Sequence, residues 1–351
     1  MYQVALLGAG RIGKVHAASL ARLGRAQLRY VADVDARAAA ELAASTGARV
    51  AQIDAILADP AIDAVLICTS TDTHADLIER AVRQGKAVFC EKPVDLSLER
   101  ARACAREVAA SGRPCMIGFN RRFDPTFAAL KRRLQDGEIG NAETLVITSR
   151  DPAPPPVSYI DRSGGIFRDM LIHDFDMFRF LLDDEAASVV ATGSCLVDPA
   201  TGSCLVDPAI GRAGDIDTAA VLIRTRRGRL CVINASRRAV YGYDQRIEVL
   251  GSAGMLQADN PPPTQVRAST VAGVTGDKPP YFFLERYAEA YRLELTRFFE
   301  ALDTQRAPTP GVDDGVRALE LAEAAARSWR EGRVVELDEA VETLQASALA
   351  L

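Results

Sequence analysis

The sequence lacks several features that mark whole classes of protein. No run approaches the ~18 consecutive apolar residues of a membrane-spanning helix, and the opening, MYQVALLGAG, has too short an apolar run for a secretory signal. Basic residues are not in excess, because 42 Lys and Arg stand against 47 Asp and Glu and form no block. This excludes the charge pattern of a nucleic-acid or anionic-membrane binder. We therefore expect a cytoplasmic protein without nucleic-acid or membrane partners.

Residues that build disulfide frameworks and metal sites are also sparse. The seven cysteines form no Cys-x-x-Cys pair and have an odd total, which predicts reduced thiols packed as small apolar side chains. Only three histidines occur, His16, His74 and His173, and no cysteine lies near His173 at ligand spacing. A zinc site built on His173 with neighbouring carboxylates is therefore not expected.

What the chain does have is enough apolar material for two domains, since 48% of its 351 residues are hydrophobic. Up to residue 120, short apolar runs that begin at 3, 28, 64, 87 and 114 alternate with helical patterns. This alternation is typical of a doubly wound parallel sheet with helices on both faces. We expect an α/β fold in which residues 1–120 form a Rossmann domain.

After residue 120 the rhythm changes. A helical pattern at 124–136 and a strand at 142–150 precede an apolar helix at 164–182, and further strands follow near 187–198, 216–226, 229–238 and 245–251. Helices at 283–304 and 313–330 complete the pattern. Residues 121–351 are therefore predicted to form an α+β domain with a large, mostly antiparallel sheet.

The turn between the first strand and the first helix contains Gly8, Gly10 and Gly13 in the spacing G-x-G-x-x-G. Glycines there let the backbone approach a pyrophosphate at the helix N-terminus, where unpaired N–H groups favour negative charge. Asp33 ends the next strand, where a carboxylate can bind ribose hydroxyls and repel an added phosphate. NAD is therefore predicted over NADP, while a helix-capping role for Asp33 and some NADP tolerance from Arg11 stay open.

The stretch GGIFRDMLIHDFDMFRFLL, residues 164–182, places ionisable groups in one of the most apolar parts of the chain. Wound as one helix, spacings of four and three bring Asp169, His173 and Asp176 to one face, while apolar side chains cover most other directions. A paired surface couple would need a polar helix face, which this helix lacks. Because buried charge is costly unless it is paired, the pattern predicts a functional strip that faces a cavity.

Five motifs together carry a resemblance to a known family. They are GAGRIGKVH at 8–16, CTSTDTH at 68–74, CEKP at 90–93, GFNRRFD at 118–124 and the pattern D-x-x-x-H-D-x-D at 169–176. In this order and spacing they resemble the glucose-fructose oxidoreductase, inositol dehydrogenase and MocA (Gfo/Idh/MocA) family. The resemblance runs through almost the whole chain, and its later part is most similar to bacterial inositol 2-dehydrogenases.

The resemblance implies an NAD-dependent oxidoreductase whose catalytic residues are Lys92, Asp169 and His173. It implies cofactor binding by Gly8, Gly10, Arg11, Ile12, Gly13, Asp33, Thr69, Ser70, Thr71, His74, Glu91 and Lys92. Positions that match the polyol pocket of relatives are Asn120, Arg121, Asp151, Asp176 and Tyr241. A homo-oligomer, dimer or tetramer, is also implied, formed through the large sheet. The structural alternatives are that Lys92 caps a strand end and that Arg121 is solvated or holds an acidic partner.

These residue types suit the oxidation of a secondary alcohol, which sends a hydride to the nicotinamide and a proton to a base. An imidazole has an unperturbed pKa of ~6.5, so His173 suits the base, with Asp169 to orient it. Lys92 can donate a hydrogen bond to the alcohol oxygen as charge builds there. We expect oxidation of myo-inositol to scyllo-inosose. Another inositol isomer, a pyranose sugar, or NAD sensing by a non-catalytic regulator are the alternatives.

One feature departs from the family. The nonapeptide TGSCLVDPA occurs twice in succession, at 192–200 and 201–209. Because nine is odd, sliding a strand by one unit would turn every inward side chain outward, so only one copy can occupy the strand register. We expect an extruded loop or a lengthened edge hairpin around 193–209.

Overall fold

The computed structural model of the protein describes residues 1–196 and 214–337. The chain divides into two compact units, each built from separate segments of sequence. The first unit contains Met1–Ala129 and Phe283–Glu320, and the second contains Leu130–Phe282 and the residues from Leu321 onward. Two helices contribute to both units, namely α6 (Pro125–Gln135) and α13 (Val312–Glu331).

The first unit is built on a six-stranded parallel sheet with the strand order β3-β2-β1-β4-β5-β6. Its strands are β1 (Tyr2–Leu7), β2 (Ala26–Ala32), β3 (Arg49–Val50), β4 (Ala64–Ile67), β5 (Ala87–Glu91) and β6 (Cys115–Gly118). The connecting helices are α1 (Arg11–Leu23), α2 (Ala36–Thr46), α3 (Ile53–Ala58), α4 (His74–Arg83) and α5 (Leu98–Ser111), with short 3-10 turns η1 (Thr71–Thr73) and η2 (Asn120–Phe123). The order reverses between β1 and β4, which confirms the predicted doubly wound fold.

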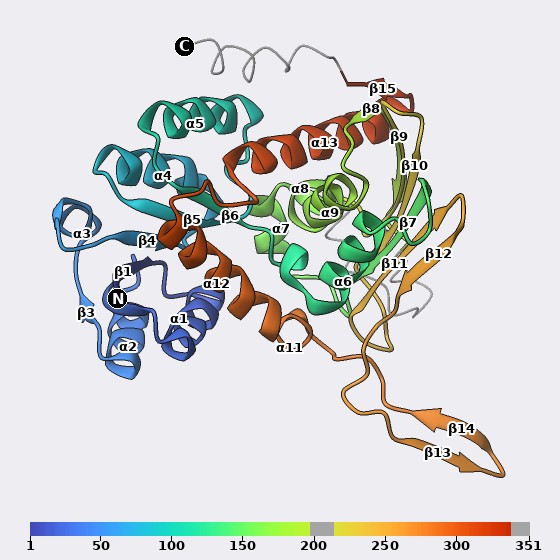
Figure 1. Ribbon diagram of the computed structural model, residues 1–351, viewed down its shortest axis with the longest axis horizontal. Coiled ribbons are helices and arrows are strands. Elements are labelled where there is room, and N and C mark those ends of the chain that lie inside the picture. The colour runs from blue at the N-terminus through green and yellow to red at the C-terminus, as the bar shows by residue number, and fades with distance from the viewer. Residues whose placement is uncertain (197–213, 338–351) are drawn as a thin grey trace. The chain divides into compact units, whose positions relative to one another are not determined.

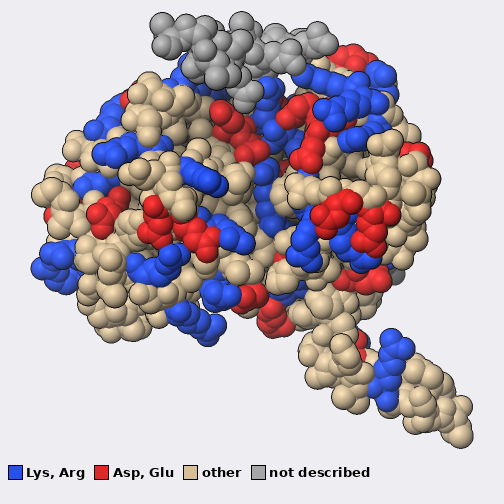
Figure 2. Space-filling view, viewed as in Figure 1, with Lys and Arg blue, Asp and Glu red and all other residues tan. Residues whose placement is uncertain are grey.

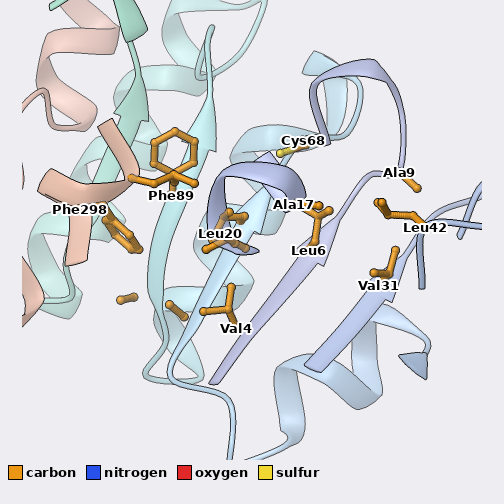
Figure 3. Packing of buried hydrophobic residues seen from close by; sticks show 14 of the residues in the cluster. Val4, Leu6, Ala9, Ala17, Leu20, Val31, Leu42, Cys68, Phe89 and Phe298 are labelled. Atoms are coloured by element: carbon orange, nitrogen blue, oxygen red, sulfur yellow. The ribbon is translucent and has the colours of Figure 1, made fainter. Parts of the chain in front are cut away.

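Alternation along the strands gives this sheet two apolar faces, because successive side chains point to opposite sides. Val4 and Leu6 of β1 and Phe89 of β5 belong to one buried cluster together with residues of α1, α2 and α12 (Ala288–Thr304). Figure 3 shows Phe298 of α12 facing Phe89, and their rings meet edge to face at 6.0 Å. Helices α4 and α5 pack together on the other face (Figure 1). The late helix α12, preceded by α11 (Phe283–Arg286), thus completes the first core.

The second unit is built on a seven-stranded sheet with the order β12-β11-β7-β10-β9-β8-β15. Its strands are β7 (Ala142–Arg150), β8 (Ala186–Ser194), β9 (Thr218–Thr225), β10 (Leu230–Ser236), β11 (Asp244–Gly251), β12 (Gly254–Ala258) and β15 (Val335–Glu336). Only the β10–β7 pair among these is parallel, which confirms the mostly antiparallel sheet. A separate hairpin of β13 (Arg267–Thr270) and β14 (Gly273–Gly276) extends beyond it (Figure 1).

The expected single helix over 164–182 is wrong in one respect. The structure has α7 (Val157–Ser163), then α8 (Gly165–Asp169), and then α9 (Ile172–Leu182). The Leu171 N–H donates to the Ile166 carbonyl, five residues back, so one extra residue is taken up where α8 ends. Asp169 therefore lies on a different helix from His173 and Asp176. Among the described residues, no helix has the length and apolarity needed to cross a membrane.

The first copy of the repeated nonapeptide begins inside β8. Thr192, Gly193 and Ser194 pair in register with β9, and a Cβ on Gly193 would lie 2.3 Å from the Ile216 side chain. The Leu196 N–H then donates to the Asp217 carboxylate at 3.2 Å. The remainder of the expected extruded segment, residues 197–209 and with them the whole second copy, lies outside the described residues.

We predict that deleting residues 201–209 leaves the fold intact. The connection between Leu196 and Asp215 would be halved, and loop-closure entropy favours the shorter chain by only about 0.6 kcal/mol. Thermal and urea unfolding should therefore show a free energy of unfolding equal to that of the full chain, or slightly higher. A loss of several kcal/mol would contradict the loop interpretation.

A matched pair of substitutions separates the two copies. Gly193→Ala should destabilise the chain, because its Cβ meets Ile216 and the Thr218 carbonyl. Gly202→Ala, the same change in the same local sequence, should alter the unfolding midpoint little. Equal effects would show that the second copy is packed like the first.

Candidate active site

The glycine turn after β1 brings backbone segments into unusually close contact. Gly8 has a φ of +103°, and a Cβ there would lie 2.4 Å from the Cys68 carbonyl. A Cβ on Gly13 would lie 2.0 Å from the Gly8 carbonyl oxygen, whereas one on Gly10 would meet nothing within 4 Å. Gly10 immediately precedes α1, a helix of 13 residues, and no side chain caps its first turn. Because nothing lies near a Cβ on Gly10, this helix start adjoins open space. This arrangement fits a dinucleotide pyrophosphate.

Asp33 lies just beyond β2 and contacts the same turn. One carboxylate oxygen accepts a hydrogen bond from the Ala9 N–H at 2.5 Å, and the other accepts one from the Asp35 N–H at 2.8 Å. The helix cap that was the alternative role for Asp33 is supplied by Asp35, which accepts from the Arg37 and Ala38 N–H groups at the start of α2. Asp33 therefore links the strand end to the glycine turn.

The loop after β4 is held through His74, the first residue of α4. The ring of His74 is buried, with Nδ1 2.7 Å from the Pro93 carbonyl oxygen and Nε2 3.1 Å from the Thr69 carbonyl oxygen. Burial lowers the pKa of His74 and outweighs the two carbonyls, which favour the charged ring. A neutral ring has one N–H group, which donates to one of these two carbonyl oxygens, and the ring lies between the Thr69 loop and the residue after Lys92. In the loop itself, the Thr69 and Thr73 hydroxyl oxygens are 2.7 Å apart.

Polar residues lie at the carboxyl ends of β5 and β6, the last two strands of the first sheet. Glu91 ends β5, and its carboxylate lies 2.6 Å from His16 Nε2, with Lys92 half-buried beside it. Asn120 and Arg121 lie in η2 after β6 and are both buried. The Arg121 guanidinium lies 6.0 Å from the centre of the Tyr287 ring, so its solvated alternative is wrong.

The second unit contains the remaining catalytic candidates. Asp169 ends α8 and accepts a hydrogen bond from the Tyr159 hydroxyl at 3.0 Å. His173 lies in the first turn of α9 and is partly exposed, whereas Asp176, one turn later, is buried. The helices thus give Asp169 and His173 partial access and place Asp176 in the interior of the unit.

Asp151 and Tyr241 lie at one end of the second sheet. The Asp151 N–H continues the ladder by donating to the Ser236 carbonyl at 2.9 Å. The Tyr241 hydroxyl donates to the Asp244 carboxylate at 2.5 Å and accepts from Arg150 at 3.0 Å. Burial would raise the pKa of Asp244, but hydrogen bonds from Arg246, Tyr241 and Asn260 outweigh it and hold that pKa below its usual range.

A cavity of about 490 Å³ adjoins this network and holds Tyr241. The described residues that line it are Arg150, Leu196, Asp217, Thr218, Asn234, Ala235, Ser236, Arg238 and Tyr241. Asp169, His173 and Asp176 are not part of this lining. The cavity is therefore a feature of the sheet end and carries none of the proposed acid–base groups.

The predicted residues are thus brought together in two sets. The first follows the carboxyl ends of parallel strands and includes the glycine turn, Asp33, the 69–74 loop, Glu91, Lys92, Asn120 and Arg121. The second set lies in the other unit and consists of Asp151, Asp169, His173, Asp176 and Tyr241. The meeting of Lys92 with His173 stays a prediction.

Sequence reasoning missed two polar residues of the first unit, His16 and Glu294. Both are fully buried, and Glu294 lies on α12 among Tyr291, Leu295 and Phe298. A signal was present, because Glu294 is three residues after Tyr291 and four before Phe298, on the apolar stripe of its helix. His16 carried no comparable signal.

Comparison with known proteins agrees with these features. Residues 2–119 match an oxidoreductase family with an NAD-binding Rossmann fold, and residues 127–257 match the GFO/IDH/MocA C-terminal domain. The chain is 52% identical to the inositol 2-dehydrogenase of Rhizobium meliloti (strain 1021) over 334 residues, which cover 95% of this chain and 98% of that protein.

Solved structures give the same result. The crystal structure of a myo-inositol dehydrogenase from Corynebacterium glutamicum ATCC 13032 superposes with a TM-score of 0.90 at 45% identity, covering 96% of this chain and 99% of that one. A myo-inositol dehydrogenase from Lactobacillus casei, in complex with NAD(H) and myo-inositol, superposes with a TM-score of 0.86 at 26% identity and covers 96% and 97%. NAD is the cofactor that this Rossmann domain binds, and the chain belongs to the GFO/IDH/MocA family of oxidoreductases.

Proposed function

We propose that this chain oxidises a secondary hydroxyl group of a cyclic polyol with NAD, and that its substrate is myo-inositol, which becomes scyllo-inosose. The observation that carries this proposal is the 52% identity to an inositol 2-dehydrogenase over 95% of the chain, and the uncapped helix N-terminus at the glycine turn supports it. The proposed division of labour assigns NAD binding to residues 1–120, and substrate binding and assembly to residues 121–351.

The mechanism assigns one task to each reacting side chain. Bound NAD supplies the hydride acceptor. His173 removes the hydroxyl proton as the carbonyl forms, and Asp169, itself held by Tyr159, orients the imidazole and stabilises its charge. Lys92 donates a hydrogen bond to the reacting oxygen and holds down its developing negative charge.

Substrate recognition falls to Asn120, Arg121, Asp151, Asp176 and Tyr241. Side chains that both donate and accept hydrogen bonds suit a ring with many hydroxyl groups and no charge. Because Arg121 is buried over Tyr287 and Asp176 is buried in its unit, their positions are set by packing before a ligand arrives. Such prior ordering favours discrimination between hydroxyl configurations.

We also propose a homo-oligomer assembled through the exposed face of the second sheet. Val190, Leu222 and Val232 are neighbours on β8, β9 and β10, and 36%, 45% and 37% of their respective surfaces are exposed. Contiguous exposed apolar side chains favour a protein interface. On the side of the molecule shown in Figure 2, Lys and Arg side chains lie among Asp and Glu side chains. The free thiols of the described chain suit a reducing compartment, and we propose the cytoplasm.

The direct test follows NADH formation with myo-inositol, scyllo-inositol, glucose and xylose, each with NAD and with NADP. Turnover is expected to be highest with myo-inositol and NAD. Preference for scyllo-inositol or a pyranose would assign a sibling activity. No turnover with any of them, while NAD still binds, would favour a regulatory protein.

Removing either proposed reacting group should abolish most of the activity. Lys92→Ala and His173→Ala are each expected to lower kcat by about 10²–10⁴-fold, since each removes a positioned proton-transfer or hydrogen-bonding group. NAD binding, measured by calorimetry, should persist in His173→Ala. Lys278→Ala, an exposed lysine of the second unit, is the control and should keep normal turnover. A normal kcat in either test variant would remove that residue from the mechanism.

Cofactor choice should depend on Asp33. Asp33→Ser is expected to raise the ratio of kcat/KM for NADP over NAD at least about tenfold, because the carboxylate would repel a 2′-phosphate. The value for NADP should rise, and the value for NAD should fall because the carboxylate that accepts the Ala9 N–H and faces the ribose hydroxyls is removed. Asp35→Ser, two residues later at the cap of α2, should leave the ratio unchanged. An unchanged ratio in Asp33→Ser would show that another group sets the preference.

A further inference from the structure

Three titratable side chains meet inside the first unit, directly behind the strand end that precedes Lys92. His16 of α1, Glu91 of β5 and Glu294 of α12 bring one ligand-type atom each to within 4.8 Å of one another. His16 Nε2 lies between the two carboxyl groups, 2.6 Å from Glu91 and 4.0 Å from Glu294. His16 and Glu294 are completely buried, and Glu91 is 8% exposed.

The position of Glu91 follows from strand alternation. Ala87, Phe89 and Glu91 share one face of β5, and that face is covered by α1 and α12. On the next strand, a Cβ at Gly118 would lie 3.1 Å from the Glu91 carboxyl carbon. Glu91 is therefore held between a glycine on one side and the His16 ring on the other.

The charge state of the cluster follows from its burial. Burial, and secondly the nearby Glu91, raise the pKa of Glu294 well above its usual range, so Glu294 carries a proton. Neither oxygen of Glu294, nor Nδ1 of His16, has a hydrogen-bond partner among the described residues. Of the two neutral His16 tautomers, the one with its hydrogen on Nε2 donates to Glu91 and leaves no donor of the ring unmet.

Other groups around Glu294 do not compete for this proton. The Cys68 thiol, from the end of β4, has its pKa raised by burial and by both glutamates, so it stays neutral. On η2, which also packs against α12, Arg121 lies over Tyr287 and Arg122 pairs with Asp314 at 3.0 Å. The proton is therefore a property of Glu294 with Glu91 and His16.

Burying these three polar side chains among apolar ones lowers the free energy of unfolding. The His16 ring meets the rings of Phe89 and Tyr291 edge to face, at 5.0 and 5.7 Å. A carboxyl group without a partner in such surroundings lowers stability, and an apolar side chain of similar volume would avoid the cost. Polar groups kept at such a cost, beside a ligand-binding strand end, point to a role in function.

We propose that His16 and Glu294 are positioning residues: they enclose the carboxylate of Glu91 and thereby fix its orientation and that of the adjoining Lys92. The protonated acid leaves a single negative charge at the strand end, and the His16 N–H orients it. The role of Lys92 in this inference rests on the proposed function. The expected effect of the cluster on NAD binding does not, because the Rossmann domain binds NAD whichever substrate the enzyme oxidises.

The first test compares Glu294→Gln with Glu294→Met in NADH binding, followed by fluorescence. The Gln variant keeps a neutral polar group of the same shape and should bind NADH within about twofold of the unaltered chain. The Met variant removes the carboxyl group that lies within 4.8 Å of the polar atoms of His16 and Glu91, and it should bind about tenfold more weakly because the strand end is less ordered. Its melting temperature should be equal or higher, because a costly buried acid has been removed.

The second test uses pH and does not require the Met variant to fold. A carboxyl whose pKa is raised on folding binds its proton more tightly in the folded state, so it costs stability above the unfolded pKa of ~4.3. The melting temperature of Glu294→Gln minus that of the unaltered chain should therefore rise between pH 5 and 8. Glu300→Gln, the same change on the partly exposed side of α12, should show no such trend.

Either of two results would overturn the proposal. Normal NADH binding by Glu294→Met would show that the cluster does not position Glu91. One tightly bound metal ion per chain, found by elemental analysis of the purified protein, would show that a cation replaces the proton between the three ligands. NADH binding is measured without polyol turnover. A wrong substrate assignment would therefore not change the result of this test, and the two proposals can fail separately.

Discussion

The close approach of backbone at Gly8 and Gly13 is the constraint on which the cofactor half of the molecule depends. A side chain at either position would overlap backbone atoms of β4's end or of the turn itself. Their absence lets α1 start against the ends of β1 and β4, with an uncapped first turn whose N–H groups adjoin open space. Asp33, the 69–74 loop and Glu91 are arranged around that helix start, so an error in the turn would displace all of them.

Several side chains predicted to touch the cofactor also hold the backbone that surrounds it. Asp33 accepts the Ala9 N–H, and the buried His74 ring lies between the carbonyls of Pro93 and Thr69. Such contacts fix loops that would otherwise have to be ordered when the ligand binds, which lowers the entropic cost of binding. The polar residues at this edge thus hold the scaffold, in addition to the contacts with the cofactor that are predicted for them.

The sequence predicts the element order well, because strands buried on both faces read as short apolar runs bounded by glycine and helix signals. The same property places the motifs at strand ends. The sequence does not show that α12 covers the first sheet. The apolar stripe that includes Tyr291, Leu295 and Phe298 indicates only that this side of the helix is buried, not against which surface. Nor does the sequence show the break at Met170, because apolar residues cover most directions of that helix and no periodicity marks a five-residue turn.

Glu294 differs from other buried ionisable side chains of the first unit, because those have hydrogen-bond partners. Asp124 pairs with Arg286 there, and the Lys86 amine donates to the carbonyls of Asp59 and Ile62 at 2.6 and 2.8 Å. Glu294 is instead kept neutral, so the cluster behind Lys92 has one carboxylate rather than two. In the mechanism proposed for Lys92, a second negative charge there would attract its ammonium group more strongly and compete with the reacting oxygen. Neutralising Glu294 by burial, rather than by an arginine, therefore keeps a second negative charge away from Glu91 at this strand end.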